Sequence, residues 1–126
     1  MDKLNWDDYA PYFHKEEFDC RCGCGLNLMK KHTMDMLLVA RGNSTYPFSI
    51  NSGTRCPNHN KDKGGTKRSS HLSGEAADIF TGANKAKAYV ILIALSNAGF
   101  RRFGIGKNFI HADDDITKMQ GVIWTY

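Results

Sequence analysis

The segment 83–97 constrains the fold of this chain more than any other. It combines strong helix formers with an unbroken apolar run from Val90 to Leu95, and Ala98-Gly99 then provides a stop signal. Because so little of its surface is polar, a helix formed here has to be covered on most sides. We therefore predict a helix over 83–97 that packs centrally against a sheet.

The remaining segments predict a second helix and several strands. Apolar residues at three- and four-residue intervals predict an amphipathic helix from Met29 to Arg41, which Gly42 ends. Extended stretches bounded by turn residues predict strands at 46–51, 76–80, 103–107, 109–113 and 121–126. Residues 58–68 are polar and contain Gly64-Gly65, so we expect a mobile loop there.

Length and charge limit the classes of protein that this chain can belong to. A chain of 126 residues is expected to form one domain, 1–126, with its own core. No apolar run approaches the ~20 residues that span a bilayer, and residues 1–8 lack the pattern of a signal peptide, so we expect synthesis in the cytosol and no membrane partner.

The net charge of +4 includes a basic cluster, Lys61, Lys63, Lys67 and Arg68. Such a cluster can attract nucleic acid or an anionic wall polymer, or can simply be solvated.

Residues 1–25 are predicted to form an irregular segment, rich in aromatic residues and cysteine, that lies on the domain. The irregular spacing of the aromatic residues suits a segment whose rings are tucked inward. The segment ends in three thiols, and a fourth lies far along the chain: Cys20, Cys22, Cys24 and Cys56. Free thiols, a disulfide to Cys56 and a second structural metal ion are all open, and synthesis in the cytosol favours the free thiols.

A histidine and a carboxylate, His71 and Asp78, mark the candidate functional site. Imidazole and carboxylate are ordinary zinc donors, and a catalytic zinc takes three protein ligands. Gly74 permits a sharp bend between the two residues, and the small Ala76 leaves room beside the carboxylate. The spacing alone also fits a loop histidine and a turn-forming aspartate, so a third donor is needed.

The predicted strand 109–113 offers this third donor. His111 and Asp113 share one face of an extended strand, so an imidazole and a carboxylate can point together at the same site.

Arg55 follows the predicted strand 46–51. A guanidinium near a metal can hold a substrate carboxylate or an oxyanion, whereas the alternative is an ordinary surface or ion-paired arginine.

Together these residues resemble a known family. The chain resembles the zinc D-Ala-D-Ala carboxypeptidases and L-Ala-D-Glu endopeptidases, whose fold is shared with the hedgehog signalling domain. The resemblance lies in the pattern Ser69-x-His71-x-x-Gly74-x-Ala76-x-Asp78, followed by His111 in a strand. The resemblance also includes residues 17–20, 52–60 and 64–65, and it covers about residues 12–126 in all. The chain looks most like the short single-domain bacteriophage enzymes of this family.

The resemblance implies an α+β domain, with a central antiparallel sheet and helices packed to one side. It also implies one zinc ion held by His71, Asp78 and His111, and hydrolysis of a bond in peptidoglycan stem peptides. Arg55 would then be a catalytic and substrate-binding residue, and Ser69 a second substrate contact.

The chain departs from the better-known members at the catalytic base. Those members carry Glu or Asp three residues before the last histidine, where this chain has Asn108. His111-Ala112-Asp113 matches the phage-like branch instead, so Asp113 is expected to be the catalytic acid/base or a group that orients a ligand.

The resemblance further implies a phage or prophage lysis enzyme. We expect a monomer that is made in the bacterial host cytoplasm and acts on peptidoglycan after release, as a carboxypeptidase or an endopeptidase. The alternative is a catalytically silent, zinc-containing module that binds the cell wall, which Asn108 at the usual base position suggests. A nucleic-acid partner, suggested by the basic cluster alone, is not expected.

Overall fold

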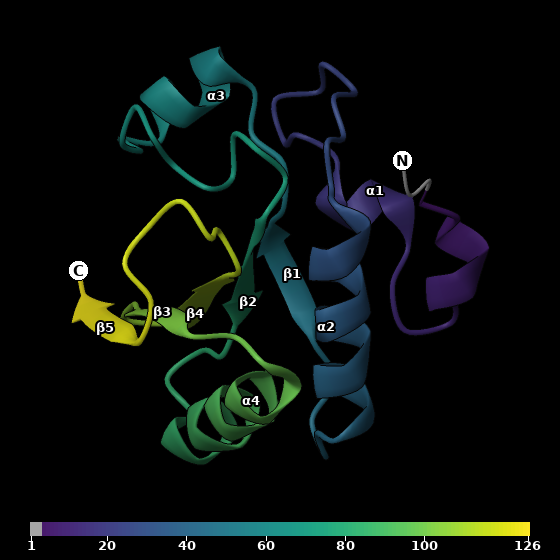
Figure 1. Cartoon of the computed structure of the whole chain (residues 1–126), viewed down its shortest axis with the longest axis vertical. Coiled ribbons are helices and arrows are strands. Elements are labelled where there is room, and N and C mark those ends of the chain that lie inside the picture. The colour runs from purple at the N-terminus through teal and green to yellow at the C-terminus, as the bar shows by residue number, and fades with distance from the viewer. Residues whose placement is uncertain (1–3) are drawn as a thin grey trace.

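The computed structural model describes residues 4–126 and consists of one five-stranded sheet with helices around it (Figure 1). The helices are η1 (Trp6–Tyr9, a 3-10 helix), α1 (Lys15–Phe18), α2 (Lys31–Gly42), α3 (Pro57–Asp62) and α4 (Lys85–Ala98). The strands are β1 (Ser49–Ser52), β2 (Ala76–Phe80), β3 (Arg102–Ile105), β4 (Phe109–Asp113) and β5 (Val122–Thr125). The predicted α+β class is confirmed.

The sheet is mixed rather than wholly antiparallel. Its strand order is β1-β2-β4-β3-β5, and every neighbouring pair is antiparallel except β3 and β5, which run parallel. The loop after β4 explains this difference from the expected sheet. It starts at Asp113, opposite Arg102, and returns to the same end of β3, where the N–H of Gly121 donates to the carbonyl oxygen of Arg101 at 2.8 Å. Strand β5 therefore begins beside the start of β3 and runs in the same direction.

The predicted helix forms as α4, but the expectation that it is covered on most sides is wrong, because Tyr89 and Ile93 are exposed. Asn84 caps it by accepting a hydrogen bond from the Lys87 N–H at 3.0 Å, and Gly99 ends it in the left-handed conformation with a φ of 116°. Its fully buried residues, Ile91 and Leu95, belong to the same core as Leu37 of α2. The two helices lie side by side in Figure 1.

The two faces of the sheet have different environments. Ala77 and Ile79 of β2, and Ile110 and Ala112 of β4, belong to the core that includes α2 and α4. Side chains alternate along a strand, so the residues between them point to the opposite face. That opposite face carries the candidate site.

The N-terminal segment lies against this core. Tyr9, Phe13 and Phe18 are buried, and the ring centroids of Phe13 and Phe18 are 5.6 Å apart, whereas Tyr12 is half exposed. The rings are tucked inward as predicted, although η1 and α1 add short helices to the segment. Residues 1–3 of the predicted segment lie outside the described residues.

The loop predicted at residues 58–68 begins with a helix instead. Pro57 occupies the first turn of α3, and the Cys56 sulfur accepts a hydrogen bond from the His59 N–H at 3.4 Å as the N-cap. The rest of the segment, residues 63–68, has no helix or strand.

Within residues 4–126, no helix is both long and apolar enough to cross a membrane.

Candidate metal centre

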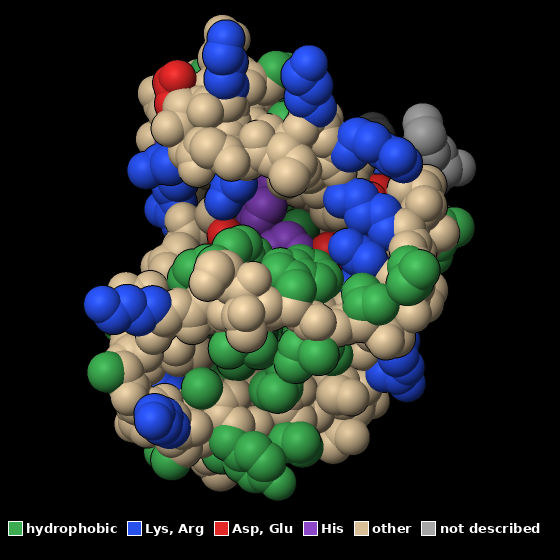
Figure 2. All heavy atoms as spheres, turned by 90° about the vertical axis from the view of Figure 1, so that its left-hand side faces the viewer, with side chains coloured by type: hydrophobic (Ala, Val, Ile, Leu, Met, Phe, Trp, Pro, Cys, Tyr) green, Lys and Arg blue, Asp and Glu red, His purple; other side chains and the backbone are tan. Residues whose placement is uncertain are grey.

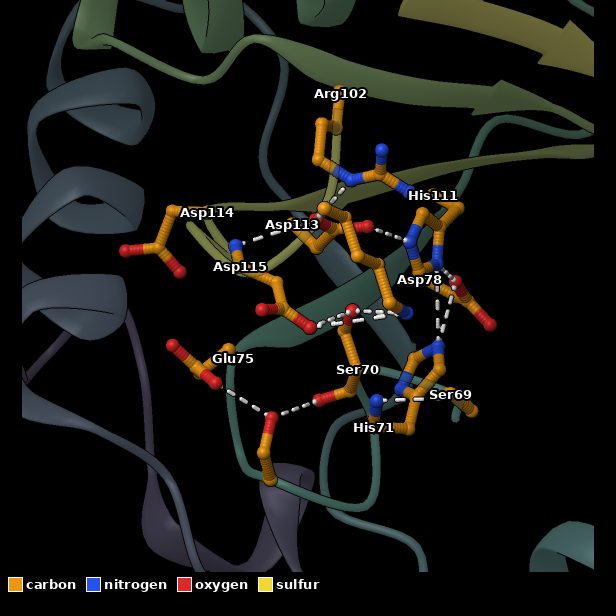
Figure 3. Close-up of polar contacts among 12 residues, drawn as sticks. Ser69, Ser70, His71, Glu75, Asp78, Arg102, His111, Asp113, Asp114 and Asp115 are labelled. Atoms are coloured by element: carbon orange, nitrogen blue, oxygen red, sulfur yellow. Dashed lines mark hydrogen bonds and ion pairs between the residues drawn. The ribbon is translucent and has the colours of Figure 1, made fainter. Parts of the chain in front are cut away.

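The pairing of β2 with β4 brings the distant candidate donors together. Antiparallel register places Asp78 opposite His111, and the turn before β2 carries His71 to the same place (Figure 3). Gly74 permits this turn, because its φ is +75° and a Cβ there would lie 1.9 Å from the Leu28 carbonyl oxygen. All three candidate donors are buried.

Each imidazole is oriented by a hydrogen bond at its far nitrogen. His71 Nδ1 lies 2.7 Å from the carbonyl oxygen of Gly53, and His111 Nε2 lies 2.7 Å from Oδ2 of Asp113. Carbonyl and carboxylate oxygens only accept hydrogen bonds, so these two nitrogens carry the ring protons. In the neutral rings, His71 Nε2 and His111 Nδ1 therefore present lone pairs toward Asp78.

Three lone pairs meet at one point. Oδ1 of Asp78 lies 3.2 Å from His71 Nε2 and 3.0 Å from His111 Nδ1, and the two nitrogens are 3.3 Å apart. Acceptors this close repel one another unless a cation or a shared proton lies among them. A tetrahedral zinc ion with bonds of about 2.0–2.1 Å holds its ligand atoms about 3.3–3.4 Å apart. The geometry and chemistry of this donor set therefore fit zinc, and the group can hold a metal ion.

The acidities of the donors reflect the same crowding. Burial opposes charge on Asp78, but the imidazoles of His111 and His71, which donate to this carboxylate once they gain a second proton, outweigh burial and hold the pKa of Asp78 well below its usual range. Burial also opposes charge on His111, but hydrogen bonds to Asp113 and Asp78 raise the pKa of its imidazole above the ordinary value. The site thus favours positive charge among its donors, which a divalent cation supplies without protons.

The donors lie at the base of a cleft of about 600 Å³. Figure 2 shows histidine side chains at the bottom of a hollow, with lysine and arginine above it and to its sides and hydrophobic side chains below it. The basic residues that line the cleft are Arg55, Lys63, Arg102 and Lys118. The site is therefore open on one side and suited to an anionic ligand.

Arg55 and Ser69 both reach this cleft. Nη2 of Arg55 donates to Oδ2 of Asp78 at 3.2 Å, and its Nε donates to Ser52 Oγ at 3.2 Å. The guanidinium is thus fixed beside the candidate donors. The Ser69 hydroxyl accepts a hydrogen bond from the His71 N–H at 3.3 Å, which helps to shape the turn that carries this histidine.

Asp113 lies on the far side of the His111 ring from the other two candidate donors (Figure 3). It is 1% exposed. Its Oδ2 contacts His111, and its Oδ1 accepts from Arg102 Nε at 2.7 Å and from the Asp115 N–H at 3.3 Å. Both oxygens are engaged, as in a group that orients a ligand. Asn108 is exposed, just before β4.

A family model described as Peptidase M15 matches residues 11–113, which is most of the chain. The chain belongs to the peptidase M15 family. No curated protein matches it. The matched range of this M15 peptidase contains His71, Asp78 and His111 and ends before β5. The chain is therefore a metallopeptidase-family hydrolase with a candidate His-Asp-His metal site.

Strand β5 of this M15 peptidase provides a wall of the cleft that was not predicted from the sequence. The Trp124 ring lies 5.5 Å from the His111 ring, and the Arg102 guanidinium lies 5.1 Å from the centre of the Trp124 ring. Tyr126 also lines the cleft. Alternation along residues 122–126 places Trp124 and Tyr126 on one face, which was a usable signal, but the face that meets the site depends on the pairing with β3.

A polar link between the loop after β4 and the turn of His71 was also not predicted. Ser70 Oγ donates to Asp115 Oδ2 at 2.9 Å, and Lys118 Nζ donates to Ser70 Oγ at 2.9 Å. Ser70 directly precedes His71, so these bonds hold the turn in position. No sequence pattern indicates the link, because its partners are far apart along the chain.

Proposed function

We propose that this M15 peptidase is a zinc enzyme that hydrolyses a peptide bond in peptidoglycan stem peptides. The observation that carries the proposal is the buried triangle of lone pairs from His71, Asp78 and His111 at the base of an open, basic cleft. Two imidazoles, one carboxylate and an open side are the ligand pattern of a catalytic zinc.

Zinc in this position would lower the pKa of a water molecule to about 7 and polarise the scissile carbonyl. The protein's own residues orient the donors. Gly53 and Asp113 fix the two imidazole rings, and Arg55 holds the second oxygen of Asp78, so that its first oxygen stays directed at the histidines.

The charge of the cleft supports a substrate with free carboxylates, as stem peptides have. Arg55 is the best-placed partner for a substrate carboxylate, because its guanidinium is held beside the donors and can bind two oxygens in parallel. We assign Ser69, which also lines the cleft, as a second substrate contact. Both a D-Ala-D-Ala carboxypeptidase and an L-Ala-D-Glu endopeptidase fit this pattern of charge.

We assign Asp113 to the orientation of His111. The support is that both of its carboxylate oxygens are engaged, by His111 on one side and by Arg102 on the other. In the acid/base alternative, Asp113 would have to release one of these partners in order to reach a substrate.

We also propose that the protein acts at the bacterial cell wall as a phage or prophage lysis enzyme. In this proposal it is made in the host cytoplasm, reaches the wall after release, and works as a monomer without a nucleic-acid or membrane partner. The support is the similarity of residues 52–60 and 69–78 to the short phage enzymes, together with a basic cleft that suits an anionic polymer.

A zinc-containing module that binds the wall without catalysis is the second candidate. The observation that favours it concerns the carboxylates that could carry protons during catalysis. Among the described residues that line the cleft, only Asp78 and Asp113 carry one, and both are engaged by neighbouring side chains. A binding module needs no further proton carrier.

Products from defined substrates test these proposals. Zinc-loaded protein should release D-Ala from a stem pentapeptide or cut the L-Ala-D-Glu bond, as read by mass spectrometry. His71→Ala should lose both the zinc ion of the cleft and the products, whereas the control His14→Ala, at an exposed histidine outside the cleft, should keep both. Wall binding without any product from fully metal-loaded wild type would support the binding module and reject the enzyme.

A further inference from the structure

All four cysteines gather at a second place in the molecule, and none of them lines the cleft. Cys20, Cys22 and Cys24 lie in and beside the turn after α1, and Cys56 is the N-cap of α3. Their sulfur atoms all lie within 4.8 Å of one another, and all four thiols are free. Residues more than thirty positions apart in the sequence thus converge on one point.

The separations between the sulfurs fit a shared metal ion. Cys20 Sγ lies 3.4 Å from Cys22 Sγ, which lies 3.7 Å from Cys56 Sγ. A tetrahedral zinc ion with Zn–S bonds of about 2.3 Å separates its sulfurs by about 3.8 Å, whereas a disulfide joins two sulfurs at about 2.05 Å. The arrangement is a four-cornered cluster rather than two bonded pairs.

Backbone N–H groups are directed at these sulfurs. The Cys56 N–H donates to Cys20 Sγ at 3.3 Å, and the His59 N–H donates to Cys56 Sγ at 3.4 Å. Such bonds stabilise thiolates, which are the form of cysteine that binds zinc. Gly23, with a φ of 88°, allows the tight turn that places Cys22 and Cys24 near Cys20.

We propose that Cys20, Cys22, Cys24 and Cys56 bind a structural zinc ion. Four thiolates close the coordination sphere and leave no position for substrate, so this second site is structural. It is separate from the candidate site of His71, Asp78 and His111, and it neither requires nor excludes zinc there.

The position of the cluster gives the ion a definite role. It ties the turn after α1 to the residue that directly follows Arg55. The same turn is bound to β1, because Arg21 Nη2 donates to the Ile50 carbonyl oxygen at 2.7 Å. A zinc ion here would therefore hold the start of α3 and the backbone beside Arg55. It would also stabilise residues 63–66, which follow α3 and line the cleft.

Cobalt substitution tests the proposal without reference to activity. Wild-type protein prepared under reducing conditions and loaded with Co²⁺ should show an intense near-ultraviolet sulfur-to-cobalt charge-transfer band. The double variant His71→Ala/His111→Ala should retain this band and a single zinc ion after dialysis. Cys22→Ser/Cys24→Ser should lose the band, and because both cysteines are exposed, its circular dichroism should remain that of a folded chain.

Two results would overturn the proposal. One is wild-type protein whose four thiols are reduced but which gives no charge-transfer band with excess Co²⁺. The other is intact mass showing two disulfides in protein purified under reducing conditions. The isolated protein could also contain iron in place of zinc, with the cobalt band and its dependence on the cysteines unchanged. That result would show that the ion is not zinc but would leave the four proposed ligands in place.

Discussion

Asp78 and His111 face each other across the β2–β4 pair, with Asp78 Oδ1 only 3.0 Å from His111 Nδ1. In the neutral ring, His111 Nδ1 carries no proton when Nε2 donates to Asp113, so this contact needs a cation or a further proton between its two atoms. Sheet register therefore fixes the position of the candidate ion. A ligand pair built on two adjacent strands is held more rigidly than one built on loops.

Asp78→Asn should lose metal affinity. The amide keeps the shape of the carboxylate but removes its charge, so zinc affinity should fall at least ~100-fold, more than the ~10–100-fold typical of partners that only orient ligands. Competition with a chromophoric chelator measures this loss. Asp62→Asn, at an exposed carboxylate of α3, is the control and should bind zinc like wild type; equal affinities for the two variants would argue against Asp78 as a ligand.

Asp113→Asn separates orientation from acid/base catalysis. If Asp113 orients His111, zinc affinity should fall about 10–100-fold, and activity should largely return when zinc is saturating. If it carries protons, affinity should stay near that of wild type while kcat falls and does not recover. We expect the first result, measured as kcat over a zinc titration.

Arg55→Lys should weaken the substrate interaction while leaving the metal bound. A lysine cannot contact Ser52, Asn60 and Asp78 together as Arg55 does. Loss of one charge-assisted hydrogen bond worth about 1.5–3 kcal/mol should lower kcat/KM about 10–150-fold. Zinc content is measured in parallel, and a variant with wild-type kcat/KM would exclude Arg55 from substrate binding.

Gly74→Ala should destabilise the protein far more than Gly64→Ala. Both glycines have a positive φ, of 75° and 71°, but a Cβ at Gly74 would lie 1.9 Å from the Leu28 carbonyl oxygen, whereas nothing lies within 4 Å at Gly64. The strain alone should cost about 1–2 kcal/mol at Gly64. Urea unfolding should show a larger loss at Gly74, and similar losses would mean that the segment at Leu28 yields easily.

Asp35 should contribute stability that disappears in acid. Burial opposes its charge, but hydrogen bonds from Lys31 and Tyr9 outweigh burial and hold the pKa of Asp35 below its ordinary value of 3.8. A carboxyl whose pKa is lowered on folding stabilises the folded state above pH 3.8, and loses this effect as the pH falls through the folded pKa.

Asp35→Asn should therefore cost about 0.5–1 kcal/mol at pH 7, because the group is partly exposed and screened. The difference from wild type should shrink progressively below pH 3.8. Denaturant unfolding across this range measures it, and a difference independent of pH would assign the effect to packing.

The parts of the fold that local pattern controls were predictable. The apolar run at 90–95 and the glycine after it determined α4, and alternation in 76–80 and 109–113 placed Asp78, His111 and Asp113 on a shared face. The three donors could be proposed because short spacing and strand period bring them together once β2 and β4 pair. The antiparallel sheet and the one-sided helices were expected from family resemblance rather than from local pattern.

The parts that depend on long-range register were not predictable. The parallel β3–β5 pair and the Arg102–Asp113 contact follow from which strand lies beside which, and no local pattern in β5 specifies that choice. The start of α3 was missed for another reason. Pro57 favours a helix start, but the polar residues after it resembled a loop more strongly.

The last strand forms one side of the cleft, and Tyr126, which is largely exposed, also lines the cleft. Any peptide joined after this residue would begin at the mouth of the cleft, next to Trp124 and the His111 ring. An affinity tag fused there would compete with substrate for the same space.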